Sequence, residues 1–187
     1  MKEIIIQDKI FERVDLLPKN EYENCTFVYC NFSESNLSEI TFIDCLFDSC
    51  NLTLAKINNT KFRDVKFKDC KMLGLKFDSC DEFGLSFSFE GCVLNNATFY
   101  KTKIKKTIFK NTQLEETDFA DADLTGVVFD NCNLSKAIFD HTNVEKANFK
   151  TAYNYVIDPD KNRIKKAKFS AFGVAGLLQK YDIEIEN

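Results

Sequence analysis

Large apolar side chains return at every fifth residue along most of the chain. One run extends from Phe27 to Phe77, and a second, shifted by two residues, extends from Leu94 to Phe149. A period of five matches neither the 3.6-residue period of a helix nor the two-residue period of a flat strand. It indicates a repeat architecture, in which every unit of five residues occupies the same place in a larger coil.

A second position in each unit confirms this frame. The residue two places before each large apolar residue is small or medium-sized in nearly every unit, as at Cys25, Ala97 and Thr117, whereas the residue directly before it is mostly polar, as at Asn31 and Asp118. Each unit therefore directs two side chains inward and three outward. We call the large apolar residue the central residue and the one two places before it the small inward residue.

The chain resembles the pentapeptide repeat proteins, whose unit is A(D/N)LXX. The segments that carry the resemblance read CNFSESNLSEI, ADLTGVVFDNCNLSKAIF and VEKANF, and the match runs from about Cys25 to Phe149 and returns at Ile164 and Phe169. The resemblance implies an all-β fold, a right-handed quadrilateral β-helix with four units in each coil.

The residues support four sides independently. If the two-residue shift is a local bulge, every twentieth position of one column is phenylalanine: Phe27, Phe47, Phe67, Phe87 or Phe89, Phe109, Phe129, Phe149 and Phe169. Coils spaced by about 4.8 Å would stack these rings. About seven coils would give a rod roughly 35 Å long.

The frame also predicts the domain boundaries. We expect an N-terminal cap at residues 1–21, the β-helix at 22–169 with a bulge at 78–92 and a turn at 151–163, and a C-terminal cap at 170–187 made of a short helix (171–180) and a strand (183–185). A solenoid needs caps because its ends expose unpaired backbone and open core. In the bulge Glu82 falls on a central position, and we expect Phe83 to replace it in the core. The bulge is read as a corner distortion, or alternatively as a small protrusion that contacts a partner.

The predicted C-terminal cap contains four apolar residues, which is more than one end face of the rod needs to be covered. These are Phe172, Val174, Leu177 and Leu178. They predict an isologous, end-to-end homodimer.

The cysteines and the single histidine argue against a metal site, disulfides and catalysis. All eight cysteines fall on small inward positions, where a free thiol behaves as a small apolar side chain, so we expect neither a metal site nor disulfides and no cofactor. His141 is the only histidine and lies on an outward position beside Asp140. The repeat places no candidate nucleophile next to it. We therefore expect no catalytic residues and no enzyme activity. No secretory signal or membrane-length apolar run is visible, which predicts a cytoplasmic protein.

The C-terminal layout sharpens the family resemblance. The segments IDPDKNRIKK and GLLQKYDIEI resemble the end of the microcin immunity member, and more loosely the quinolone-resistance and albicidin-resistance members. That resemblance implies DNA gyrase or topoisomerase IV as the partner, through a dimeric rod that mimics duplex DNA.

The charge supports mimicry only in part. Duplex DNA carries about one charge per 1.7 Å, whereas the net charge of this chain is −4. An acidic cluster is predicted as the partner contact: Glu115, Glu116, Asp118, Asp121 and Asp123. Basic residues gather toward two adjoining sides: Lys61, Arg63, Lys66, Lys68, Lys103, Lys105, Lys106, Lys110, Arg163, Lys165 and Lys166. Because the total is acidic, direct nucleic-acid binding is not expected. Outward charges also serve simply to keep a rod soluble.

Two functions remain open from the sequence. The first is a non-enzymatic interaction protein that protects or modulates a type II topoisomerase. The alternative is a pentapeptide repeat scaffold that binds an unrelated protein partner. Function cannot be read from fold alone, and repeat proteins spread recognition over a surface rather than a short motif.

Overall fold

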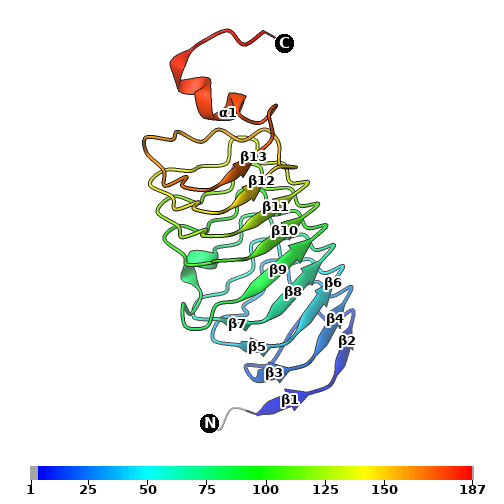
Figure 1. Cartoon of the computed structure of the whole chain (residues 1–187). Coiled ribbons are helices and arrows are strands. Elements are labelled where there is room, and N and C mark those ends of the chain that lie inside the picture. The colour runs from blue at the N-terminus through cyan, green and yellow to red at the C-terminus, as the bar shows by residue number, and fades with distance from the viewer. Residues whose placement is uncertain (1–3, 187) are drawn as a thin grey trace.

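Two ladders of short parallel strands run along the rod in the computed structural model, which describes residues 4–186 (Figure 1). One ladder consists of β1 (Ile5–Gln7), β3 (Glu21–Glu23), β5 (Thr41–Ile43) and β7 (Lys61–Arg63). The other consists of β2 (Ile10–Glu12), β4 (Thr26–Val28), β6 (Leu46–Asp48), β8 (Val65–Lys68), β9 (Phe87–Glu90), β10 (Ile108–Lys110), β11 (Val128–Asp130), β12 (Asn148–Phe149) and β13 (Lys168–Phe169). Partners in successive full coils lie twenty residues apart, as in Phe109 opposite Phe129.

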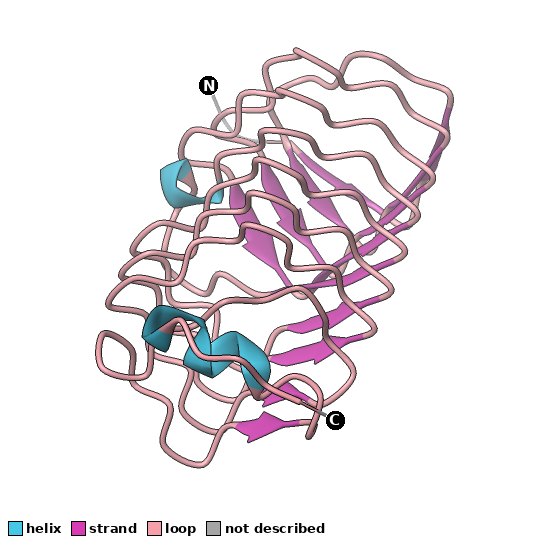
Figure 2. Ribbon diagram, turned by 90° about the horizontal axis from the view of Figure 1, so that it is seen from above, coloured by secondary structure: helices cyan, strands magenta, loops and turns pink. Residues whose placement is uncertain are grey.

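The coil has four sides, which we number in chain order by their central residues in one coil: side 1 at Phe109, side 2 at Leu114, side 3 at Phe119 and side 4 at Leu124. The nine-stranded ladder forms side 1, the four-stranded ladder forms the first half of side 4, and isolated parallel bridges join the coils elsewhere. Figure 2 views these coils from above. The predicted quadrilateral β-helix is confirmed, with about eight turns instead of seven because β2 adds a coil.

Central residues fill the interior. Every predicted central residue from Phe27 to Phe77 and from Leu94 to Phe149 is at most 7% exposed. On side 1 the rings form one column, with centroids 5.2 Å apart and planes 9° apart between Phe109 and Phe129. Phe89, not Phe87, continues this column, at 5.3 Å from Phe67. Burial of this kind contributes on the order of 1.5–3 kcal/mol per phenylalanine, and each stacked pair of rings adds about 0.5–1.5 kcal/mol.

Nearly every corner is turned by a residue in the left-handed conformation. This residue stands two places after the central residue, as at Leu54, Lys106 and His141, where φ is 55°, 60° and 52°. Gly126 occupies the same position in another coil, with φ of 72°. None of the left-handed residues in the described chain is valine, isoleucine, threonine or proline. The corner therefore selects against β-branched side chains, which that conformation crowds.

The bulge differs from its prediction. Phe83 is 80% exposed, so its expected place in the core is wrong. The amides of Asp81 and Ser86 bond to the carbonyls of Thr60 and Phe62 in the preceding coil, which fixes both ends of the insertion. The extra residues loop outward between these ends. Phe87, on a small inward position, fills the space instead, 5.2 Å from the Phe77 ring and 5.1 Å from that of Phe89.

The two ends are covered unequally. At the N-terminal end Phe11 stacks on Phe27 at 5.0 Å, so residues 4–21 extend the coil; residues 1–3 of the predicted cap lie outside the described residues. At the other end the helix is shorter than expected: α1 (Ala175–Leu178) is followed by a 3₁₀ turn, η2 (Gln179–Tyr181). The expected strand at Ile183–Ile185 is absent from the described chain, because no neighbouring strand lies beside it to pair with. Asn187 lies outside the described residues.

The corner geometry predicts an unequal response to valine. Lys106→Val should lower the free energy of unfolding by about 1 kcal/mol more than Lys103→Val, because only Lys106 has a positive φ. Both side chains are exposed, and Lys103 lies in a parallel bridge that tolerates valine. Urea unfolding of the two variants measures the difference, and equal losses would contradict it.

Candidate protein-interaction surfaces

The predicted acidic residues encircle part of one coil. Glu115 and Glu116 lie at the corner between sides 2 and 3, Asp118 lies on side 3, Asp121 at the next corner, and Asp123 on side 4. The structure thus brings them into one band across the rod. A strip along the rod axis, which would follow a DNA groove, is not formed by these five residues.

Much of the negative charge of this band is offset locally. The Glu116 carboxylate lies 3.1 Å from Lys136 Nζ, and Asp123 lies 3.1 Å from Lys105 Nζ. Burial would raise the pKa of Asp123, but hydrogen bonds from Thr125 and Lys105 outweigh it and leave the pKa lowered. Asp123 is therefore a firmly ionised carboxylate whose charge is already partnered.

The other three acidic residues of the band differ in the contacts that their side chains make. Asp118 accepts a 2.8 Å hydrogen bond from the Ala120 amide, and Glu115 contacts the Asn95 side chain. Asp121 is exposed and makes no side-chain hydrogen bond or ion pair among the described residues. The corner at Asp121 is consequently the freest negative charge of the band.

Charges on side 1 alternate from coil to coil. The column just after the central residues reads Asp48, Lys68, Glu90, Lys110, Asp130 and Lys150. Lys68 lies 3.3 Å from Asp48 and Lys110 lies 2.8 Å from Glu90. This column neutralises itself, so Lys68, Lys110 and Lys150 do not form a basic surface. Lys66, also on side 1 but outside the column, is exposed and makes no ion pair among the described residues.

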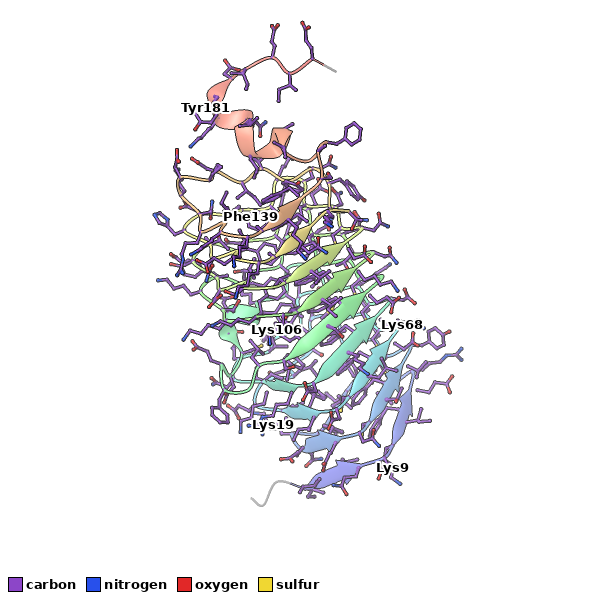
Figure 3. All side chains as sticks on the ribbon, viewed as in Figure 1. Lys9, Lys19, Lys68, Lys106, Phe139 and Tyr181 are labelled. Atoms are coloured by element: carbon purple, nitrogen blue, oxygen red, sulfur yellow. The ribbon has the colours of Figure 1, made fainter. Side chains whose placement is uncertain are left out.

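Side 4 and its corner with side 1 keep an excess of cations. They carry Lys61, Arg63, Lys103, Lys105, Lys106, Arg163, Lys165 and Lys166. Among these, Lys105 pairs with Asp123 and Arg163 pairs with Glu145 at 2.8 Å. Figure 3 labels Lys106 here and Lys68 on side 1. The sequence predicts basic residues on two adjoining sides, and in the structure mainly side 4 keeps an excess of positive charge.

The C-terminal residues divide into two pairs. Phe172 is 90% exposed and Val174 is 40% exposed, whereas Leu177 and Leu178 are half-buried and Leu177 packs against the core. A cavity of about 690 Å³ opens between this segment and the last coil. Gly176 allows the close approach, since a Cβ there would come within 2.1 Å of the Tyr155 carbonyl oxygen. Two of the predicted contact residues thus project, and two cover the end.

The cysteines line the interior as small side chains. All eight are buried, and Cys132 Sγ lies 3.3 Å from the Phe109 carbonyl oxygen of the coil below. Burial raises the pKa of Cys45 and of Cys132 to about 12. Within residues 4–186 no group of three or more His, Cys, Asp or Glu side chains is placed to hold a metal ion. His141 is exposed, with Nδ1 3.3 Å from Asp140.

The repeating coil, the four-sided core and the left-handed corners define a pentapeptide repeat β-helix. The family model for the pentapeptide repeat region matches residues 20–88 and again 85–153. The chain belongs to this family. A comparison with curated proteins finds no match, and no helix in the described part of the chain is long and apolar enough to cross a membrane.

Solved structures of QnrB1, a plasmid-mediated fluoroquinolone resistance protein, share the fold. Two trypsin-treated variants are each 18% identical to this chain, with TM-scores of 0.60 and 0.61, and the match covers 98% of both chains. The full-length protein is 17% identical with a TM-score of 0.60, over 96% of this chain and 100% of that one. At this identity the likeness concerns the architecture.

Thiol burial predicts a loss of stability at alkaline pH. The unfolded chain releases thiol protons above the ordinary pKa of 9.0, whereas folded Cys45 and Cys132 hold theirs to about 12. The contribution of these buried thiols to the free energy of unfolding is therefore fully present below pH 9.0. It is lost between pH 9.0 and about 12, by about 1.4 kcal/mol per pH unit for each thiol. Urea unfolding across this range should give a shallower decline for Cys132→Ala than for the unaltered protein. Identical slopes would show that Cys132 ionises alike in both states.

Proposed function

We propose that this chain is a non-enzymatic interaction protein that binds and modulates a type II topoisomerase, DNA gyrase or topoisomerase IV. The main support is architectural: the rod with its short C-terminal helix matches QnrB1, a fluoroquinolone resistance protein, over 98% of both chains. The C-terminal sequence layout that resembles topoisomerase-directed members of the family points the same way. Binding, rather than catalysis, is the chemistry that a rod of outward polar side chains supports.

The proposed contact is the acidic band from Glu115 to Asp123. Its exposed corners at Glu116 and Asp121 project from the coil in the left-handed conformation. A topoisomerase surface that binds DNA phosphates would pair with such carboxylates. Because Lys105 and Lys136 offset part of the band, the mimicry of DNA proposed here is local and does not extend over the whole rod.

One observation favours the second candidate, a scaffold for an unrelated partner. Charges of both signs alternate along side 1 and meet in ion pairs on side 4, whereas a DNA mimic would carry one sign. Such a scaffold would bind through a particular patch and leave topoisomerase activity unchanged.

We expect the protein to change the supercoiling activity of purified gyrase, either by restoring activity in the presence of a quinolone or by inhibiting it at higher protein concentration. Charge reversal by Glu116→Lys with Asp121→Lys should weaken either effect by about tenfold or more, because it places cations against the partner's cations. Glu34→Lys is the matched control, since Glu34 is exposed at an equivalent left-handed corner.

The absence of any effect of the unaltered protein, with or without quinolone, would refute the topoisomerase proposal and favour the scaffold. An effect that Glu116→Lys with Asp121→Lys leaves intact would keep the partner but place its contact elsewhere on the rod.

We also propose a homodimer through the C-terminal end. Phe172 and Val174 project there, and Tyr181, Ile183 and Ile185 are each more than half exposed. Apolar side chains gathered at one end are stabilised when a second copy covers them.

Phe172→Asp should convert a dimer into a monomer, because it would bury an unpaired carboxylate in the contact. Light scattering after size-exclusion chromatography measures the mass. Phe83→Asp, at another exposed phenylalanine far along the chain, should leave the dimer intact. A monomeric mass for the unaltered protein at all concentrations tested would rule out this dimer.

A further inference from the structure

The bulge on side 4 interrupts the regular wall of the rod. The four-stranded ladder ends at β7, and the insertion that includes Phe83 occupies the place of its next strand. A cavity of about 240 Å³ lies between this insertion and the following coil. Apolar side chains of Phe77 and Leu85 line it, together with Tyr100, Lys101 and Lys103. The wall of side 4 is thus hollowed where the insertion interrupts the repeat.

Phe83 lies in the chain between Glu82 and Leu85, which line the cavity, but its own ring projects toward Arg63 of the preceding coil on a turn that is held in place. Its amide donates a 2.8 Å hydrogen bond to Asp81 Oδ1, and Ser86 Oγ donates one of 2.8 Å to Asp64 Oδ1. The Arg63 guanidinium lies 5.8 Å from the centre of the Phe83 ring. A phenylalanine that is 80% exposed yet fixed by its turn presents apolar area without a large ordering cost, as binding anchors do.

Cations on side 4 and at its corners flank the bulge in both neighbouring coils, with Arg63 against the Phe83 ring and Lys101 and Lys103 at the cavity. They are Lys61, Arg63, Lys101, Lys103 and Lys106, and none has a carboxylate within ion-pair distance in the described structure. Asp81 within the turn and Asp64 in the preceding coil accept hydrogen bonds from neutral donors and keep their negative charges. Asp78 and Glu82 lie on the cavity wall, so four carboxylates lie among the five cations and the surface keeps a small excess of positive charge.

We propose that this surface, which we call the bulge surface and define by Phe83, the cavity and the five surrounding cations, binds an acidic protein segment. One apolar side chain of the segment enters the cavity over Leu85, and flanking carboxylates pair with the cations. Charge complementarity fixes the class of partner, because unpaired lysines and arginine favour carboxylates. The bulge surface adjoins the acidic band, since Lys103 lies in a parallel bridge with Asp123, but none of its defining residues belongs to the band. Binding of an acidic segment there does not require a topoisomerase partner, so this proposal does not depend on the proposed function.

A protein segment fits the bulge surface better than a nucleic acid does. Single-stranded nucleic acids bind along a basic groove with several aromatic platforms, on which successive bases stack. Here the two exposed aromatic rings, Phe83 and Tyr100, lie on different coils, and the carboxylates of Asp78 and Glu82 at the cavity would repel a continuous phosphate chain. Separate carboxylates on a peptide can avoid those two groups.

Selection from a random peptide library displayed on phage, with counter-selection on Phe83→Ser, tests the proposal. The recovered sequences should be rich in Asp and Glu around one large apolar residue. A labelled synthetic copy should bind the unaltered protein in a fluorescence anisotropy titration and should bind more weakly at higher salt, since ion pairs at an exposed surface are screened. Phe83→Ser and Lys103→Glu should each weaken binding by about tenfold or more.

Two matched variants control for nonspecific effects. Tyr29→Ser removes another exposed aromatic side chain at a different corner, and Lys150→Glu reverses an exposed lysine on side 1; both should bind the peptide as the unaltered protein does. All four variants should melt within a few degrees of one another, because the altered side chains lie outside the core.

Three results would overturn the proposal. The first is that no sequence survives counter-selection on Phe83→Ser. The second is that the survivors lack acidic residues or bind Lys103→Glu equally well. The third is that a labelled oligothymidine strand binds the unaltered protein more tightly than the peptide and depends on Phe83, which would identify the surface as a nucleic-acid site.

Discussion

The structure depends on one relationship: residues twenty apart lie directly above one another, joined by parallel backbone hydrogen bonds. The bond from the Val128 amide to the Thr107 carbonyl joins neighbouring coils, and the Phe109 and Phe129 rings stack within the same pair of coils. Backbone pairing and side-chain stacking therefore impose the same spacing. Because each coil contacts chiefly its neighbours, the core is one continuous stack along the rod, and any change of register must be absorbed where it occurs.

The same relationship governs the surface. Outward residues twenty apart also become neighbours, so an acid can find its counter-ion a coil away, as Glu116 finds Lys136 and Glu90 finds Lys110. The segment from Glu115 to Asp123 is acidic in sequence. In the structure, lysines from the neighbouring coils pair with two of its carboxylates and neutralise part of its charge. Regular stacking thus favours self-neutralising columns, and the surfaces that retain unpaired charge are those at corners such as Asp121 and around the bulge.

Regularity also explains why the exceptions carry the functional interest. A uniform wall offers a partner mostly repeated polar positions, with single exposed apolar side chains such as Ile108 and Ile138. The insertion near Phe83 breaks the wall, opens a cavity and exposes an aromatic ring, and the C-terminal end leaves Phe172 uncovered. The acidic band belongs to the regular part of the rod, whereas the other two surfaces arise where the repeat stops. A partner that needs more than charge has those two places to bind.

The sequence alone determined the repeat, its four sides and its core, because the inward positions recur with a fixed spacing that only one kind of coil satisfies. It also placed the bulge near Glu82. The tertiary structure decided which phenylalanine enters the core there: backbone bonds at Asp81 and Ser86 fix the loop ends, and Phe87 rather than Phe83 fills the interior. It likewise decided which acids are partnered, since ion pairs such as Asp123 with Lys105 join side chains of different coils. The segment at Ile183–Ile185 has the composition of a strand, but a strand forms only where another chain segment pairs with it.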